Sequence, residues 1–231
     1  MPASIGGLDL LPVWWVRPMS EDWLSDTRTS YDADAAGHVE KVRGLLDGNP
    51  YLRASLALFA ELVRDAGGGL VADVGCGPGY VTRHLRGLEV EAFGVDLSAE
   101  MIAIARREYP DLRFEVGTMT DLGWDEHSIA GLLAFWSVIH VPDQAIPGVF
   151  GQFHRVLRPG GPLLVGFHAG RGKSHTSRGY TGRAINVDSY RREPREVSAW
   201  LRDAGFVIEA ELVLRPDDEL PGAVVFARNG G

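Results

Sequence analysis

Several features that mark particular classes of protein are scarce or absent in this sequence. A single cysteine, Cys76, leaves no partner for an internal disulfide, which is typical of a protein from a reducing compartment. No run approaches the roughly 18 uncharged apolar residues that a membrane-spanning helix needs. The N-terminus lacks the basic head, apolar stretch and small-residue cleavage site of a secretory signal. We therefore expect a cytoplasmic protein with no membrane partner.

Positive charge is also scarce. The chain has 23 lysines and arginines against 31 aspartates and glutamates, a formal net charge of −8. General binding to nucleic acid needs a basic footprint that contacts phosphates, so no nucleic-acid partner is expected. No cluster of histidine, cysteine and carboxylate residues has the spacing of metal ligands, so we expect no metal site. The oligomeric state stays open between monomer and homodimer.

The composition itself is that of an ordinary globular protein, with 45% hydrophobic residues over 231 positions. This is enough for one well-cored α/β domain and a small cap. We expect an N-terminal helical cap over residues 19–66 and the main domain over 67–231. Residues 1–18 have two interpretations, which both remain open. They form either an extension before an alternative initiator, Met19, or a segment whose tryptophans pack on the domain or on a partner.

Apolar segments alternate with helical patterns from residue 70 onward. Strands are expected over 70–74, 90–96, 112–116, 129–135, 162–167, 206–214 and 223–227. Helices are expected over 30–48, from Pro50 to the glycines at 67–69, from the loop after the first strand to Leu85, and over 98–109, 145–157 and 194–204. Strands and helices that alternate in this way predict a Rossmann-like α/β fold. We expect a mostly parallel seven-stranded sheet with helices on both faces.

Three glycines follow the first expected strand directly, at positions 75, 77 and 79. Glycine lets the backbone turn tightly and lets a ligand approach the main chain closely. The dinucleotide fingerprint Gly-x-Gly-x-x-Gly would need a glycine at position 80, where the chain has Tyr80. A phosphate-binding P-loop would need Gly-Lys-Ser/Thr, which is absent. The spacing therefore disfavours both NAD and ATP.

Asp96 ends the second expected strand, 17 residues after Gly79. This is where the ribose-binding carboxylate of a nucleoside site belongs in such folds. Asp96 is not needed to cap the following helix, because Ser98 is placed to do so. The loop and the carboxylate together therefore indicate a nucleoside site.

Four motifs in order resemble those of class I methyltransferases that use S-adenosylmethionine (SAM). They are Asp-Val-Gly-Cys-Gly-Pro-Gly at 73–79, Gly-Val-Asp-Leu-Ser at 94–98 with Met101, Phe-His-Arg-Val-Leu-Arg-Pro-Gly-Gly at 153–161, and Asp-Ala-Gly-Phe at 203–206. The resemblance covers about residues 28–229. It implies a methyltransferase with SAM as cofactor and S-adenosylhomocysteine (SAH) as product. It says little about the acceptor.

The resemblance also implies which residues contact the cofactor. Gly75, Gly77 and Gly79 would face its methionine part, with Asp73 ordering that loop. The remaining implied contacts are Asp96 to the ribose, Leu97 and Met101 against the adenine, Thr118 and Met119 at the adenine edge, Phe135, Trp136 and Ser137 near the sulfonium, and Tyr31 closing over the cofactor. Many relatives have an aspartate where Thr118 stands, so a hydroxyl or a backbone carbonyl would recognise the adenine amino group here.

Two histidines follow expected strands and are candidates for a catalytic base. His140 comes just after the fourth strand, and His168 ends the fifth. Histidine titrates near neutral pH, so either one can remove a proton from an acceptor. The alternative is that each only binds a loop or the cofactor through a hydrogen bond. We expect the acceptor to contact Tyr31, Trp136, His140, His168, Arg171 and Arg178.

A segment at 171–195 reverses the acidic character of the chain. Its basic residues are Arg171, Lys173, Arg178, Arg183, Arg191, Arg192 and Arg195, and its acidic ones are Asp188 and Glu193. Two interpretations remain open. The segment is either an insertion that acts as a lid and captures an anionic acceptor through its guanidinium groups, or a solvated loop.

The function expected from these features is methylation of a small-molecule acceptor, most readily O-methylation in bacterial secondary metabolism. N- or C-methylation is an alternative. A further one is a non-methyl-transfer reaction on the same fold, such as a cyclisation. A SAM-binding regulator is disfavoured because Asp96 and the glycines are intact. Methylation of tRNA or rRNA is disfavoured by the overall acidity.

Overall fold

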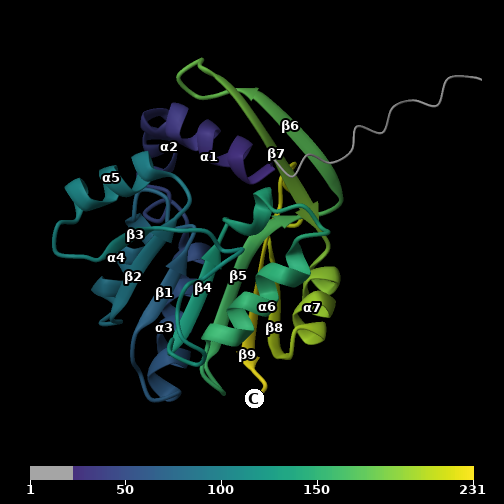
Figure 1. Cartoon of the computed structure of the whole chain (residues 1–231). Helices are drawn as coiled ribbons and strands as arrows, with labels where there is room; N and C mark the ends of the chain where they lie inside the picture. Colours follow the sequence, from purple (N-terminus) through teal and green to yellow (C-terminus); the bar gives the residue numbers. More distant parts are fainter. Residues whose placement is uncertain (1–22) are drawn as a thin grey trace, which may run out of the picture.

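The computed structural model describes residues 23–231, and Figure 1 shows the arrangement of its helices and strands. The segment at 1–18, with both of its interpretations, lies outside the described residues. Within 23–231, no helix is long and apolar enough to cross a membrane.

Three helices precede the sheet: α1 (Trp23–Ala33), α2 (Ala35–Val42) and α3 (Pro50–Asp65). The single helix expected over 30–48 is wrong, because the chain breaks at Asp34 and α2 ends at residue 42. The start of α3 at Pro50 is confirmed. The Asn49 side chain caps this helix by accepting a hydrogen bond from the Leu52 N–H, which satisfies one of the free donors of the first turn.

The expected mostly parallel seven-stranded sheet is confirmed. Its strands are β1 (Val71–Val74), β2 (Ala92–Asp96), β3 (Phe114–Val116), β4 (Gly131–Phe135), β5 (Pro162–Ala169), β8 (Phe206–Leu214) and β9 (Gly222–Asn229). They are ordered β3-β2-β1-β4-β5-β9-β8, and only β9 runs antiparallel to its neighbours. All five residues of β4 are buried, as a strand covered on both faces requires.

Helices cover both faces of this sheet (Figure 1). On one face α6 (Ile146–Val156) and α7 (Pro194–Asp203) pack in one hydrophobic cluster with Ala72 and Val74 of β1. On the other face α3 and α4 (Tyr80–Gly87) pack in a second cluster with Val71. Alternate residues of β1 therefore face opposite layers. Because α3 belongs to this layer, the cap expected over 19–66 is reduced, within its described residues 23–66, to α1 and α2 over the end of the sheet.

The basic segment at 171–195 forms a β-hairpin of β6 (Gly172–Arg178) and β7 (Ala184–Arg192), which the sequence did not predict. Strand β7 pairs in parallel with the end of β5, so the hairpin adds two strands to the sheet. The hairpin then reaches over α1 and α2 (Figure 1). Every residue of β6 is exposed, so the strand lacks the apolar alternation that would have revealed it.

Candidate active site

A cavity of about 440 Å³ lies at the carboxyl ends of β1, β2 and β4, beneath α1, α2 and the hairpin. This is the edge at which open α/β sheets bind ligands. Most of the site residues expected from the sequence line it. They are Tyr31, Asp73, Gly75, Gly77, Asp96, Leu97, Thr118, Met119, Phe135, Trp136, Ser137, His140, His168 and Arg178.

Three of the expected contact residues lie outside this cavity. Gly79 starts α4 with φ +84°, and a Cβ there would come within 2.7 Å of the Phe114 ring, so this glycine serves packing. The Met101 side chain is fully buried in the protein. Arg171 is exposed on the hairpin and forms an ion pair with Glu193 at 3.3 Å.

The glycine loop is held close to the end of β4. At Gly75 (φ +78°) a Cβ would lie 2.1 Å from the Ser137 Cβ, which leaves no room for any other residue. The Ser137 hydroxyl donates to the Val74 carbonyl at 2.6 Å and ties the two strand ends together. At Gly77 (φ +53°) no atom lies within 4 Å of where a Cβ would be. The main chain there is open to a ligand in the cavity.

Asp96 lies beside this loop and is oriented by two backbone donors. One carboxylate oxygen accepts from the Gly77 N–H and the other from the Ser98 N–H, both at 2.8 Å. Burial raises the pKa of this carboxyl. Ser98 caps the next helix, α5 (Ala99–Glu108), by accepting from the Met101 N–H at 3.1 Å. The cap predicted from the sequence is confirmed, and Asp96 remains available to the cavity.

Asp73 is buried at the end of β1, with only 1% of its surface exposed. Its carboxylate accepts a hydrogen bond of 2.7 Å from the Thr82 hydroxyl in α4. Burial raises the pKa of Asp73 to about 7, because an ionised carboxylate loses its hydration there. Asp73 thus joins β1 to the helix that follows the glycine loop.

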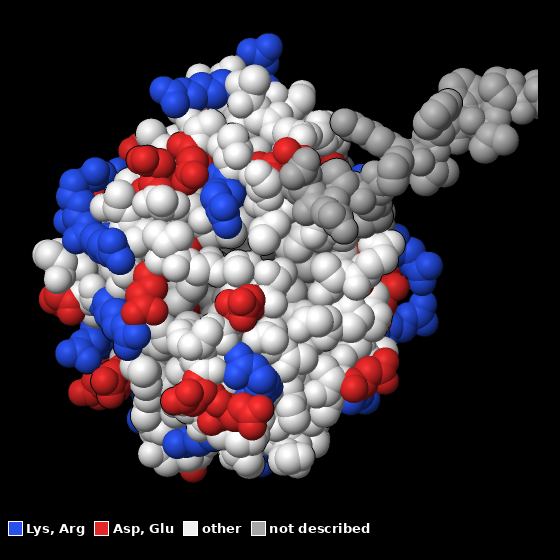
Figure 2. Space-filling model, in the orientation of Figure 1, with Lys and Arg blue, Asp and Glu red and all other residues white. Residues whose placement is uncertain are grey.

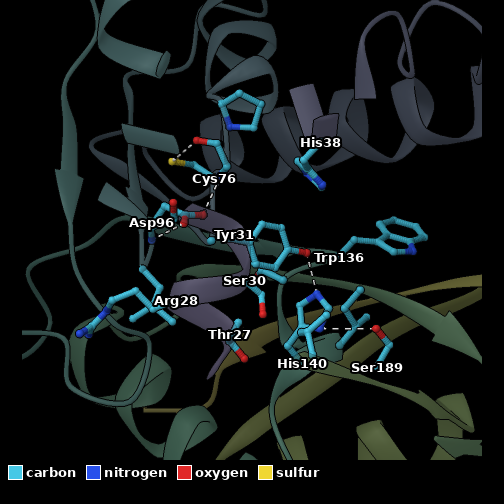
Figure 3. A pocket seen from close by; sticks show the side chains of 18 of the residues that line it. Thr27, Arg28, Ser30, Tyr31, His38, Cys76, Asp96, Trp136, His140 and Ser189 are labelled. Atoms are coloured by element: carbon cyan, nitrogen blue, oxygen red, sulfur yellow. Dashed lines mark hydrogen bonds between the residues drawn. The ribbon is translucent and has the colours of Figure 1, made fainter. Parts of the chain in front are cut away.

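Tyr31 of α1 and His140 of the short 3₁₀ helix η1 (Val138–His140) meet inside the cavity, although they are 109 residues apart (Figure 3). The Nδ1 atom of His140 lies 2.7 Å from the Asp188 carbonyl. A carbonyl only accepts, so Nδ1 carries the proton. Burial lowers the pKa of His140 to about 4, so the ring is neutral at pH 7. Its Nε2 therefore accepts from the Tyr31 hydroxyl at 2.7 Å.

His168 has the opposite arrangement of its ring nitrogens. The indole N–H of Trp136 donates to the His168 Nδ1 at 3.3 Å, so in the neutral ring the proton is on Nε2. Burial, and then the charge of Arg191, lower the pKa of His168. At neutral pH His168 is thus an N–H donor whose one lone pair is already used.

His38 of α2 also lines the cavity. Its ring meets the Tyr31 ring edge to face, with 5.2 Å between centroids. Burial lowers the pKa of His38. Tyr31 and His38 lie on different helices, α1 and α2, so no helical spacing in the sequence could have brought the two rings together.

Asp34, at the break between α1 and α2, holds the tip of the hairpin. Its carboxylate accepts from the backbone N–H groups of Tyr180 and Thr181, at 2.6 and 2.9 Å, and from the Thr181 hydroxyl. Gly179 lies so close that a Cβ would come within 2.4 Å of the Asp34 carboxylate. The hairpin tip is therefore fastened to the helices that cover the cavity.

Comparison with known proteins gives a family for the central part of the chain. A family described as a methyltransferase domain matches residues 71–161. A probable S-adenosylmethionine-dependent methyltransferase from Mycolicibacterium smegmatis is 28% identical over 124 residues, which cover 54% of this chain and 48% of that protein. The chain spans about half the length, or less, of the first curated relatives that it matches.

Solved structures match over nearly the whole chain. The DhpI–SAH complex has a TM-score of 0.70 at 23% identity, and the match covers 91% of this chain and 98% of that one. The [4+2]-cyclase SpnF has a TM-score of 0.67 at 16% identity, over 89% and 96% of the two chains. At such identities the likeness establishes the fold, which hosts more than one kind of reaction.

Proposed function

Because the chain belongs to the class I SAM-dependent methyltransferases, we propose that it transfers a methyl group from SAM to a small-molecule acceptor and releases SAH. The observation that carries this proposal is the joint placement of Gly77 and Asp96. Gly77 offers open backbone to a ligand, and Asp96 offers an oriented carboxylate at the same edge of the sheet.

The residues present fit this cofactor. A carboxylate has about four lone-pair positions, and backbone N–H groups occupy one on each oxygen of Asp96. The remaining positions suit the two hydroxyls of a ribose. Leu97, Thr118 and Met119 line the cavity beside Asp96 and would enclose the adenine of the cofactor. Of the expected cofactor contacts, Gly79 and Met101 would support this site from behind.

Methyl transfer needs orientation of the reactants and, for a hydroxyl acceptor, removal of a proton. When bound, SAM supplies a methyl group that is attached to a positively charged sulfur. A nucleophile takes this methyl group in line, and the sulfur is displaced. Tyr31, Trp136 and His168 line the cavity, and with both reactants bound their rings would keep water from the reacting atoms. A site without water has a low dielectric constant, which strengthens the electrostatic contacts between the protein and the reactants.

His140 is our candidate for the base, and His168 is our candidate for an N–H donor that orients the acceptor. The Nε2 lone pair of His140 is exposed to the cavity once the Tyr31 hydroxyl moves aside. An acceptor hydroxyl in that place would give its proton to Nε2. Its oxygen would then be the nucleophile that takes the methyl group, with SAH as the leaving group. The lone pair of His168 accepts from the indole of Trp136, whose ring is packed against Gly166 and Gly222, so we assign His168 no equivalent role.

The test is to incubate the protein with methyl-labelled SAM and a panel of phenols, alcohols and aryl amines. We expect labelled ethers from hydroxyl acceptors. Replacing His140 with Gln should lower kcat on phenols about 100-fold or more at pH 7, with a smaller loss at pH 9, where more of the phenol is ionised. His84→Gln, outside both described cavities, is the control.

Two other reactions would give different products in the same experiment. Labelled amines without labelled ethers would favour N-methylation. Conversion of an acceptor without release of SAH would favour a rearrangement such as cyclisation. Binding of SAH with no conversion of any acceptor would favour a regulator. A place in bacterial secondary metabolism, in the cytoplasm, stays a prediction.

An anionic acceptor stays a prediction that depends on Arg178. Of the arginines in the 171–195 segment, Arg178 lines the cavity, whereas Arg171 and Arg192 form ion pairs with Glu193 and Asp143. Arg178→Ala should raise the KM of a carboxylate acceptor, and Arg171→Ala, its matched control, should not. Lys, Arg, Asp and Glu are interspersed over the face shown in Figure 2, which disfavours tRNA or rRNA as the substrate.

A further inference from the structure

A second cavity of about 250 Å³ lies next to the first. It is formed between the segment before α3, which contributes Leu45 and Asn49, and the end of β8, which contributes Leu214. Five residues line both cavities: Leu45, Tyr80, Phe135, Trp136 and His168. The two spaces are therefore neighbours that share one wall.

Trp136 is the member of that wall whose position is most tightly fixed. Its backbone has φ +58°, a conformation that a large side chain rarely adopts. Its ring lies against Gly166 and Gly222, where a Cβ would come within 2.7 and 2.8 Å of the indole. The hydrogen bond from its indole N–H to His168 fixes the remaining freedom of the ring. The position of Trp136 is thus set by its backbone, by two glycines and by a polar contact.

Trp136 also lies at the acceptor end of the first cavity. In Figure 3 Asp96 and Trp136 are on opposite sides of the pocket, with Tyr31 between them. If Asp96 holds the ribose of the cofactor, the acceptor lies toward Trp136 and the second cavity. This step rests on the proposed function.

The first cavity is too small to hold a large acceptor together with the cofactor. Pockets that enclose a single drug-sized molecule measure about 300–1,000 Å³, and this one measures about 440 Å³. Most of this volume is needed for SAM, which is itself a molecule of that size. An acceptor larger than a single small ring has to extend beyond the cavity.

The mouth of the second cavity has the character of an entrance for apolar groups. Leu45, Tyr51 and Leu220 line the second cavity and have 39%, 53% and 47% of their surfaces exposed, so they lie where the cavity meets solvent. Large apolar side chains that gather at a cavity mouth mark a binding surface more often than scattered ones do. The charged residues that line this cavity, Arg215 and Asp218, are of opposite sign.

We propose that the second cavity is an acceptor subsite that takes the apolar tail of an elongated hydroxyl compound. The hydroxyl head lies at His140, the middle of the molecule passes Trp136, and the tail leaves toward Leu220. Trp136 and His168 then select the shape of the acceptor, in addition to lining the cofactor site.

The test uses the methyl, butyl and heptyl esters of 4-hydroxybenzoate, which share one phenol head and differ only in tail length. Affinity is measured by isothermal titration calorimetry, with and without saturating SAH. A fully buried CH₂ strengthens binding about fourfold. The tail lies in a cavity that is partly open, so we expect the butyl ester to bind at least about tenfold more tightly than the methyl ester.

Two substitutions fill the subsite without touching the cofactor end. Leu220→Trp acts at the exposed mouth and Leu214→Trp acts on the inner wall, and each should remove most of the dependence on tail length. Val213→Trp is the matched control, because Val213 is adjacent on β8, is 47% exposed and lines neither described cavity. It should keep the dependence found in the wild type.

The proposal is overturned if none of the esters binds, if all three bind equally, or if the two filling variants keep the wild-type dependence. Failure of the proposed function gives a different result. In that case SAH does not bind, or no ester is methylated, while the tail dependence is still measurable. Equal affinity of all four proteins for SAH shows that the variants remain folded.

Discussion

Among single residues, Asp73 is expected to make stability depend on pH. Its pKa is about 7 in the folded protein against 3.8 as the ordinary value. The folded state therefore holds this proton more tightly than the unfolded state does. The stabilising contribution is complete below pH 3.8 and is lost as the pH rises through 7.

Asp73→Asn removes this titration and keeps an oxygen for the Thr82 hydroxyl. The unfolding free energy of the variant minus that of the wild type should rise by about 2–3 kcal/mol between pH 5 and pH 8. Urea unfolding at both pH values measures it. Asp65→Asn, an exposed position in α3, controls for the substitution itself. A constant difference between variant and wild type would show that Asp73 is not protonated.

The tautomers of the two histidines give a second prediction at this scale. At pH 7 the proton of neutral His140 should be on Nδ1, and that of His168 on Nε2, as their hydrogen bonds require. Long-range ¹H–¹⁵N NMR correlations distinguish the two forms, and the titration of His140 should be centred at about pH 4. Tyr31→Phe should leave the His140 tautomer unchanged, since the Asp188 carbonyl fixes it. A proton on Nε2 of His140 would remove it as the candidate base.

Among the elements, the β6–β7 hairpin is expected to open when its contact with Asp34 is lost. Asp34→Ala removes the acceptor for Tyr180 and Thr181. Hydrogen exchange at the hairpin tip, residues 179–183, should then accelerate at least about tenfold. Asp32→Ala is the matched control. Asp32 lies two residues earlier, near the end of α1, but its carboxylate accepts hydrogen bonds from Ser98 and Glu100 at the start of α5. Equal acceleration in both variants would mean that α1 itself unfolds.

The same elements show which parts of the fold a sequence pattern can predict. The seven strands and the helices between them were found because each buries an apolar face, and burial imposes a period on the sequence. Strand β6 is exposed throughout, so its pairing with β7 leaves no such period. The break at Asp34 was also missed, because the carboxylate is used by a hairpin almost 150 residues away.

The candidate site also has one part that the sequence predicts and another that it does not. Gly75, Gly77 and Asp96 are linked by short spacings along consecutive strands and loops, so the sequence is enough to bring them together. The pairing of Tyr31 with His140 depends on how α1 lies over the sheet, and no local pattern carries that information. The shared wall at Trp136 depends on two separate glycines, Gly166 and Gly222.

At the scale of the whole molecule, the first cavity joins segments from most of the described chain. Its lining comes from α1 and α2, from the loops after β1, β2 and β4, and from the hairpin. A ligand in this cavity therefore contacts segments that lie far apart in the sequence. Any ligand that binds only the folded state stabilises it by mass action, so binding should be visible in the unfolding of the entire domain.

SAH at 100 times its Kd should stabilise the fold by about 2.7 kcal/mol, which corresponds to a rise in Tm of roughly 5–11 °C for a domain of this size. Scanning calorimetry measures this shift. NAD at the same concentration should give none, because Tyr80 stands where the dinucleotide loop needs its third glycine. Asp96→Ala should reduce the SAH shift, since the ribose loses its acceptor. A full SAH shift in that variant would place the nucleoside away from Asp96, and the order of cofactor and acceptor along the cavity would have to be reversed.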